Sequence, residues 1–208
     1  NRGIPEMGYP AVILGLRIEK SVFGGEGLAF HDGKTVFVEN ALPGERVEAR
    51  VLAEKKDWSR ARTTKVLQGS PARIEPHCRH YGRCGGCQYQ HVDYPEELRM
   101  KESQFREVLG KLAGIHDRVS GIVRGKHETG YRRSATFQVL REKRSKRPAL
   151  AYVSKDNVTP LPIQSCDLLH PALARVLEGT PAIGKDTKKI SFKISQEGKV
   201  HQDEKEVF

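Results

Sequence analysis

Residues 28–56 read LAFHDGKTVFVENALPGERVEARVLAEKK, and this stretch decides how the first third of the chain folds. Two apolar runs flank Asp32-Gly33, a pair typical of tight hairpin turns. Pro43-Gly44 marks another turn, and the alternation of polar and apolar residues in ERVEARVLAE predicts a half-buried strand. With AVILGLRIEK before and RARTTKVLQG after, we count five short strands. They predict a small closed barrel, because closure removes exposed strand edges.

The composition favours two small domains and an anionic partner. The chain has 208 residues, of which 37% are hydrophobic and 30% charged, and its net charge is +10. Residues 118–155 hold 11 Lys/Arg against 2 Asp/Glu, whereas residues 1–70 hold 11 against 9. A concentrated basic segment suits nucleic acid, although a merely solvated basic surface fits the same counts. No apolar run of membrane-spanning length and no signal-peptide core is present, so we expect a cytoplasmic protein without a membrane partner.

The rest of the chain predicts one long helix and a second β-rich region. A helix is expected from the periodic apolar residues Leu98, Phe105, Val108, Leu109 and Leu112. A proline sits in its first turn and a glycine lies at its end. Beyond residue 130 the pattern predicts two hairpins and a short helix that starts near Pro171. The expected divisions are a tail (1–10), a barrel (11–70), a linker with a cysteine loop (71–92), a helix (93–116) and a β-rich domain (117–208), which we expect to be incomplete.

All four cysteines fall into one triplet and one distant residue, Cys78, Cys84, Cys87 and Cys166. In a reducing compartment such clustering indicates metal or redox chemistry more often than disulfides. Four thiolates suit tetrahedral zinc or an iron–sulfur cluster. A triplet plus a single cysteine favours the cluster, while zinc and unrelated reduced cysteines remain alternatives. The neighbouring histidines His77, His80 and His91 are expected to be structural or to face RNA, because four cysteines already complete a ligand set.

The sequence CRHYGRCGGCQYQH, followed by YPEELRMK, closely resembles the cysteine motif of the bacterial 23S rRNA (uracil-5-)-methyltransferases. The resemblance implies that the four cysteines hold a [4Fe-4S] cluster, and PIQSC resembles the family's segment around the last ligand. The stretch from GGEGLAF to RARTTKVL is similar to the TRAM domain of the same family, an OB-like RNA-binding barrel. The fold expected is therefore mainly β with minor α, a TRAM barrel followed by a cluster-bearing α+β central domain.

Two groups of side chains are candidates for RNA contact. Around Trp58, basic residues combine cations with one stacking surface, although a tryptophan in the core or at a strand edge is the alternative. GYRRSATFQV resembles the segment that opens the family's central domain, and arginines there suit phosphates and unpaired bases. A strand with its arginines in solvent is the alternative. The candidates are Lys55, Lys56, Trp58, Arg60, Arg62, Tyr131, Arg132 and Arg133.

The resemblance does not extend to a whole enzyme. The family's catalytic half is a Rossmann-like domain that binds S-adenosylmethionine, with a D-x-F-C-G-x-G turn and a nucleophilic cysteine in S-C-N-P. Neither motif occurs in these 208 residues, and the cluster uses all four cysteines. We therefore expect the chain to lack this domain and to have no catalytic residues of its own. S-adenosylmethionine would enter only through the missing domain.

The predicted function is to position rRNA for methylation as the RNA-binding and iron–sulfur part of a uracil-5 methyltransferase. The expected partner is RNA, 23S rRNA in particular, and a monomer is favoured. A stand-alone RNA- or ribosome-binding module with a cluster or zinc is the alternative. A small iron–sulfur electron carrier fits less well, since a carrier has little use for the basic stretch or an RNA-type barrel.

Overall fold

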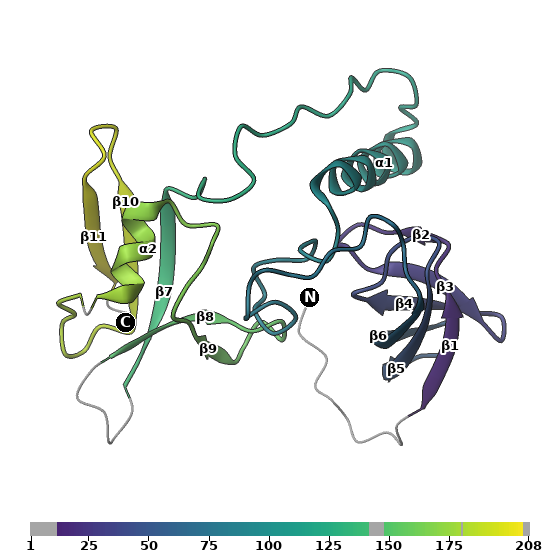
Figure 1. The fold of residues 1–208 in the computed structure, drawn as a ribbon, viewed down its shortest axis with the longest axis horizontal. Helices are drawn as coiled ribbons and strands as arrows, with labels where there is room; N and C mark the ends of the chain where they lie inside the picture. Colours follow the sequence, from purple (N-terminus) through teal and green to yellow (C-terminus); the bar gives the residue numbers. More distant parts are fainter. Residues whose placement is uncertain (1–11, 142–147, 180, 206–208) are drawn as a thin grey trace. The chain divides into compact units, whose positions relative to one another are not determined.

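The computed structural model describes residues 12–141, 148–179 and 181–205, which form two compact units (Figure 1). The barrel unit consists of residues 12–77 and 88–124, and the cysteine unit consists of residues 78–87 and 125–205. The loop with three cysteines therefore belongs to the same unit as Cys166, although it lies between two segments of the barrel unit in the sequence. The predicted tail and most of the basic run near residue 145 lie outside the described residues.

Six strands form the sheet of the barrel unit. They are β1 (Ile13–Arg17), β2 (Lys20–Ser21), β3 (Gly27–His31), β4 (Lys34–Glu39), β5 (Arg46–Glu54) and β6 (Trp58–Gln68). Their order is β1-β5-β6-β4-β3-β2, with β4 and β6 parallel and all other pairs antiparallel. The sheet curves so that β1 also approaches β3. Its inner face is apolar and includes Leu16, Ile18, Val36, Val38 and Val47.

The hairpin predicted at Asp32-Gly33 is confirmed. Both residues have positive φ, 47° and 76°, and they connect β3 to β4 in antiparallel register. Such paired positive φ angles match the twist of the flanking strands. The expectation of five strands was one short, because the first stretch divides at Ile18 into β1 and the two-residue β2. The Ile18 N–H donates to the Glu45 carbonyl (2.9 Å), so the chain bends there to reach the β4–β5 turn.

The predicted long helix is confirmed as α1 (Tyr94–Ala113). Asp93 caps its start by accepting a hydrogen bond from the Glu96 N–H (2.8 Å), and Gly114 ends it in the left-handed conformation. The apolar residues from which the helix was predicted are not the ones that it buries. The buried residues of α1 are Met100 and Gln104. The amide of Gln104 donates to the Ser21 hydroxyl (2.7 Å), which ties the helix to the barrel.

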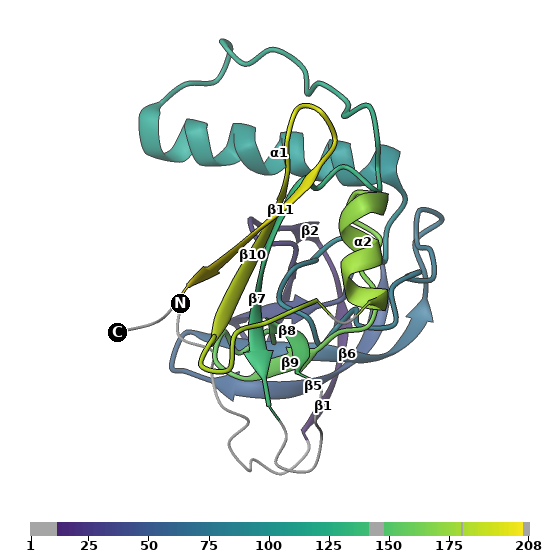
Figure 2. The ribbon, with the colours of Figure 1, turned by 90° about the vertical axis from the view of Figure 1, so that its left-hand side faces the viewer.

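The cysteine unit contains a second, antiparallel sheet and a short helix. Its elements are β7 (Ser134–Leu140), β8 (Ala149–Val153), β9 (Pro160–Pro162), α2 (Pro171–Glu178), β10 (Lys189–Ile194) and β11 (Val200–Lys205). The strand order is β11-β10-β7-β8-β9. The two predicted hairpins, β7–β8 and β10–β11, and the helix at Pro171 are confirmed. Figure 2 shows α2 beside the strands of this sheet. Leu173 of α2 packs there with Phe137 and Ile190.

Within the described ranges, no helix is long and apolar enough to cross a membrane.

Candidate functional site

The cysteine loop folds as two tight turns and lies against the end of β8. The Tyr81 N–H donates to the Cys78 carbonyl (2.9 Å), and the Cys84 N–H donates to the His80 carbonyl (2.9 Å). Cys84 then forms an antiparallel bridge with Ser154. The Gly85 N–H donates to the Val153 carbonyl (3.0 Å). Backbone hydrogen bonds therefore hold the loop on the sheet independently of any metal.

Gly85 sets how closely the loop approaches β8. A Cβ at this position would lie 3.0 Å from the Ser154 carbonyl oxygen and 3.2 Å from that of Val153. Gly85→Ala is expected to loosen the loop and destabilise the unit by about 1–3 kcal/mol, the usual range for overpacking. Faster hydrogen exchange in peptides that cover the loop and β8 would show this. Gly86→Ala is the control, since its Cβ meets only the Cys84 sulfur at 3.5 Å. Equal exchange in both variants would contradict the proposed close contact.

Cys166 lies just before α2, where its sulfur meets several groups of the unit. Burial raises the pKa of the Cys166 thiol. Hydrogen bonds from the Leu168 and Leu169 N–H groups and the charge of Arg132 act in the opposite direction, and Cys78 adds to the rise. The thiols of Cys78 and Cys166 are thus close enough to interact. The Gly86 N–H donates to the Cys84 sulfur (3.4 Å), the kind of hydrogen bond that tunes cluster potentials.

The four predicted ligands share one unit but are not arranged around a single point. Within the described residues none of the four forms a disulfide, and each is of intermediate exposure. In the part of the chain that the structure describes, no group of three or more His, Cys, Asp or Glu side chains could hold one metal ion. Tetrahedral zinc requires four sulfurs about 2.3 Å from one ion. In a four-iron cluster each cysteine sulfur binds a different iron. The four sulfurs can therefore lie farther apart than the ligands of a single zinc ion.

Among the described residues of this unit, the Nε2 of His80 and the hydroxyl of Tyr152 are buried and make no well-aligned hydrogen bond. His80 belongs to the cysteine loop, and burial, helped by Arg79 and Arg83, lowers its pKa. Tyr152 stacks on Phe137, with ring centroids 4.9 Å apart. Buried polar groups normally find a partner, and exceptions often mark an absent group. Both groups can donate hydrogen bonds and lie in the unit that holds the cysteines, which fits a bound cluster. The sequence analysis identified neither group as part of the site.

Trp58 lies on the outer face of the barrel together with other aromatic side chains. It packs edge to face on Phe37, with ring centroids 6.2 Å apart. Phe30 on the neighbouring strand β3 is 62% exposed. The turn before β6 exposes the predicted residues Lys55 and Lys56 beside this face. The sequence analysis missed the two phenylalanines, although the alternation of β3 and β4 directs them away from the core.

The two predicted arginines on β6 already have acidic partners. The Arg60 Nε lies 2.8 Å from a Glu26 carboxylate oxygen, and the Arg62 Nε donates to Glu39 at 2.9 Å. Each arginine is about one-third exposed. Their charges are therefore largely balanced within the barrel, and they add less to an anion-binding face than the lysines do.

The three predicted residues near β7 separate into two environments. Tyr131 is half exposed, and Arg133 is exposed and donates to the Ser195 carbonyl (2.7 Å). Arg132 is half-buried, and its charge interacts with Tyr152, Tyr131 and Cys166. The structure therefore groups Arg132 with the cysteines and leaves the other two at the surface.

Comparison with known proteins agrees with the predicted TRAM barrel and with the predicted family. Residues 14–63 match the model of the TRAM domain. The chain is 36% identical over 152 residues to the 23S rRNA (uracil(1939)-C(5))-methyltransferase RlmD of Pseudoalteromonas translucida, an alignment that covers 73% of this chain and 34% of the relative. An uncharacterized RNA methyltransferase of Aquifex aeolicus is 45% identical over 127 residues, 61% of this chain and 30% of that protein.

A solved structure shares the fold. The crystal structure of the Pyrococcus abyssi tRNA (uracil-54, C5)-methyltransferase in complex with S-adenosyl-L-homocysteine has a TM-score of 0.51 and 16% identity, covering 91% of this chain and 45% of that one. At this identity the likeness concerns the fold alone.

A TRAM barrel joined to a cysteine-bearing β unit defines a chain with the RNA-binding region of an RNA-modifying enzyme. The chain belongs to the RNA uracil-5 methyltransferase family. It spans about a third of the length of the curated relatives it matches, 34% and 35% in the first two.

Proposed function

We propose that this chain is the RNA-recognition and iron–sulfur part of an S-adenosylmethionine-dependent rRNA uracil-5 methyltransferase. The observation that carries the proposal is that residues 14–63 match the TRAM domain, while an alignment with a 23S rRNA (uracil-5)-methyltransferase covers 73% of the chain. Several relatives are named for uracil 1939 of 23S rRNA, and we propose rRNA as the substrate here too. Such a role would place the protein in the cytoplasm.

Catalysis would belong to a part of the protein outside these 208 residues. The relatives are about three times as long as the matched region. S-adenosylmethionine and the nucleophile that attacks the uracil would both be found there. The alternative is a stand-alone RNA-binding module. The intact mass of the native gene product separates the two, since only a methyltransferase needs a further domain of on the order of 200 residues.

The outer face of the barrel supports RNA binding. It offers Trp58, Phe37 and Phe30 as stacking surfaces, with Lys55 and Lys56 at one end. Aromatic faces that stack unpaired bases beside cations are typical of single-stranded nucleic-acid sites. Tyr131 and Arg133 offer a second, smaller pair on the cysteine unit.

Trp58→Ala is expected to weaken binding of the full chain to a single-stranded RNA oligonucleotide. Loss of one stacked base corresponds to about 1–3 kcal/mol, roughly a 5- to 150-fold increase in Kd. Fluorescence anisotropy of labelled RNA measures this, and Trp58→Phe should recover part of the affinity. The affinity of the unaltered chain should also fall steeply with salt, because phosphates are neutralised on binding.

Phe105→Ala is the matched control for this experiment. Phe105 is an exposed aromatic residue of the same unit, 55% exposed on α1, and lies outside the proposed face. Its loss should leave the Kd unchanged. Equal affinities of the Trp58→Ala and unaltered chains, or a flat salt response, would contradict the proposed RNA face.

We further propose that Cys78, Cys84, Cys87 and Cys166 hold a [4Fe-4S] cluster. In this site the cluster would supply a rigid structural link between the loop and α2. The Gly86, Leu168 and Leu169 N–H groups already donate to cysteine sulfurs, and they would do so to thiolates more strongly. Iron and acid-labile sulfide after anaerobic purification support this ligand set, whereas stoichiometric zinc without iron overturns it.

A further inference from the structure

The backbone fixes Arg132 beside the Cys166 loop. Arg132 forms a parallel bridge with Leu169. Its N–H donates to the Leu168 carbonyl (2.8 Å), and its carbonyl accepts from the His170 N–H (3.0 Å). The segment before β7 is thus joined to the segment between Cys166 and α2. These main-chain hydrogen bonds therefore keep the backbone of Arg132 next to the segment that follows Cys166.

Three side chains meet at this junction, and their mutual contacts leave a cation without a carboxylate and a hydroxyl without a well-aligned hydrogen bond. The guanidinium of Arg132, the hydroxyl of Tyr152 and the sulfur of Cys166 interact with one another. The Tyr152 hydroxyl is buried and makes no well-aligned hydrogen bond, although the Arg132 guanidinium and the Cys166 sulfur lie near enough to interact with it. Among the residues described, Arg132 forms no ion pair with a carboxylate, in contrast to Arg60, Arg62 and Arg73.

This arrangement of Arg132 and Tyr152 is unfavourable beside a neutral Cys166 thiol and favourable beside an anion at the same place. A half-buried cation without a carboxylate and a buried hydroxyl without a well-aligned hydrogen bond both reduce stability. A four-iron cluster with four thiolate ligands carries net negative charge. Placed at Cys166, it would supply the missing counter-charge and an acceptor for the hydroxyl.

We propose that Arg132 and Tyr152 are positioning residues of the cluster. Arg132 stabilises its negative charge, and Tyr152 donates a hydrogen bond to sulfur at the Cys166 corner. The inference rests on the proposed [4Fe-4S] site, and it assigns to Arg132 a role other than contact with RNA. Tyr131 and Arg133 then remain the RNA candidates of this segment.

The first test compares Arg132→Gln with Lys193→Gln in the full, cluster-loaded chain. Lys193 is an exposed cation of the same unit on β10, so its loss controls for net charge. Arg132→Gln should lose its visible absorbance about 10-fold faster under a chelator, the lower end of the usual effect of outer-shell substitutions. Its midpoint potential, measured with dithionite, should become more negative, because a nearby cation favours the reduced, more negative cluster. Arg132→Lys should recover part of both properties, and Lys193→Gln should change neither.

The second test uses Tyr152→Phe, which removes the hydroxyl and keeps the ring stacked on Phe137. In the metal-free chain this change should leave the melting temperature unchanged or slightly raised, since an unpartnered buried hydroxyl is lost. In the loaded chain it should accelerate cluster loss. A merely structural role for the hydroxyl would change both forms alike.

The outcomes separate the two proposals. Iron and sulfide present, with equal loss rates and potentials in the unaltered chain and Arg132→Gln, would overturn the role of Arg132 and leave the cluster standing. Tyr152→Phe with unchanged cluster retention would overturn the role of the hydroxyl. Absence of iron and sulfide from the unaltered chain would overturn the cluster itself and this inference with it.

Discussion

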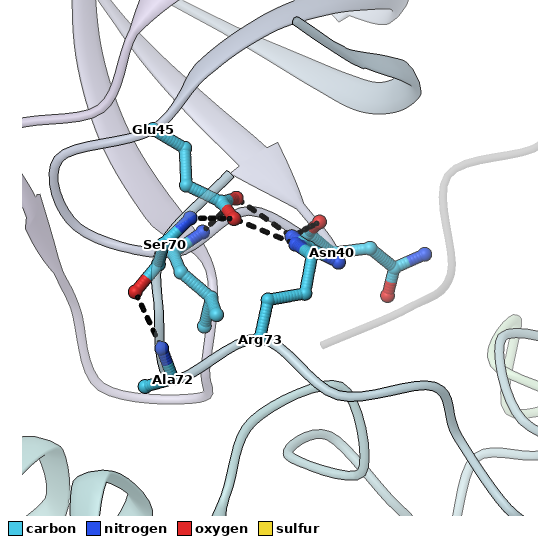
Figure 3. Close-up of polar contacts among 6 residues, drawn as sticks. Asn40, Glu45, Ser70, Ala72 and Arg73 are labelled. Carbon is cyan, nitrogen blue, oxygen red and sulfur yellow. Dashed lines mark hydrogen bonds and ion pairs between the residues drawn. The ribbon is translucent and has the colours of Figure 1, made fainter. Parts of the chain in front are cut away.

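Arg73→Ala is expected to destabilise the barrel unit by about 3–5 kcal/mol, the range for a buried ion pair that loses one partner. Arg73 binds the Glu45 carboxylate through Nε and Nη2, each at 2.6 Å, and its Nη2 also donates to the Asn40 carbonyl at 2.9 Å (Figure 3). The Glu45 side chain is 0% exposed. Removal of the guanidinium would leave this carboxylate buried with no counter-charge.

The pair matters because it joins segments that the sheet does not join. Glu45 also accepts hydrogen bonds from the Leu42 N–H (2.9 Å) and the Ser70 N–H (3.0 Å). One carboxylate therefore connects the turn before β5 to the chain that leaves β6. Without it, both segments would lose their shared anchor at this end of the barrel.

Urea unfolding followed by fluorescence measures the loss in the barrel alone, because Trp58 is the chain's one tryptophan and lies in the barrel unit. Arg106→Ala is the matched control. Arg106 pairs with Glu102 on the surface of α1, at 2.7 Å and one turn apart, and such pairs contribute about 0.3–0.5 kcal/mol. If Arg73→Ala and Arg106→Ala shift the unfolding free energy equally, the buried pair does not have the role assigned to it.

The pH dependence provides an independent check. Burial raises the pKa of Glu45, but the hydrogen bond from Arg73, the two N–H donors and the arginine charge outweigh it, so the net pKa lies below its ordinary 4.5. A carboxylate with a lowered pKa stabilises the fold above its unfolded pKa and loses that contribution as the pH falls through the folded pKa. The unaltered barrel should therefore weaken below about pH 4.5. Arg73→Ala should lose less on acidification, because its Glu45 pKa is higher.

Local chemistry explains which parts of the fold were predictable. The Asp32-Gly33 turn, the Asp93 and Gly114 caps of α1 and the start of α2 at Pro171 each depend on a few adjacent residues, whose preferences the sequence displays directly. The parallel pairing of β4 with β6 depends on how the whole sheet curves. No local pattern encodes it.

Contacts between residues that are distant in sequence explain why parts of the candidate sites could not be predicted. Arg60 and Arg62 looked like free cations because Glu26 and Glu39 are distant in sequence. The sequence predicted the same RNA-contacting role for Arg132 and Arg133. The bridge between Arg132 and Leu169, which places Arg132 beside the Cys166 segment, depends on the folded structure. The cysteine spacing predicts one ligand set, and the structure shows only that the four cysteines lie in the same unit. The spacing could not show that backbone hydrogen bonds to β8 already hold the loop.

If the proposed [4Fe-4S] cluster is bound, Cys166→Ser is expected to abolish its retention while the metal-free cysteine unit keeps its fold. The serine oxygen can still accept the Leu168 and Leu169 N–H hydrogen bonds that the sulfur accepts now. The loop remains on β8 through the Cys84–Ser154 bridge and the Gly85 hydrogen bond. Only the fourth thiolate is lost, so iron and sulfide should fall to near background.

The melting temperature then isolates what the cluster contributes. Because a ligand that binds only the folded state raises its stability, the loaded chain should melt above the metal-free chain, and Cys166→Ser should match the metal-free chain. Ser165→Ala, the exposed neighbour, is the control and should retain the cluster. Full iron and sulfide in Cys166→Ser would show that Cys166 is no ligand. Equal melting of loaded and metal-free chains would show that the backbone contacts alone hold the loop, and that the cluster adds no link between the loop and α2.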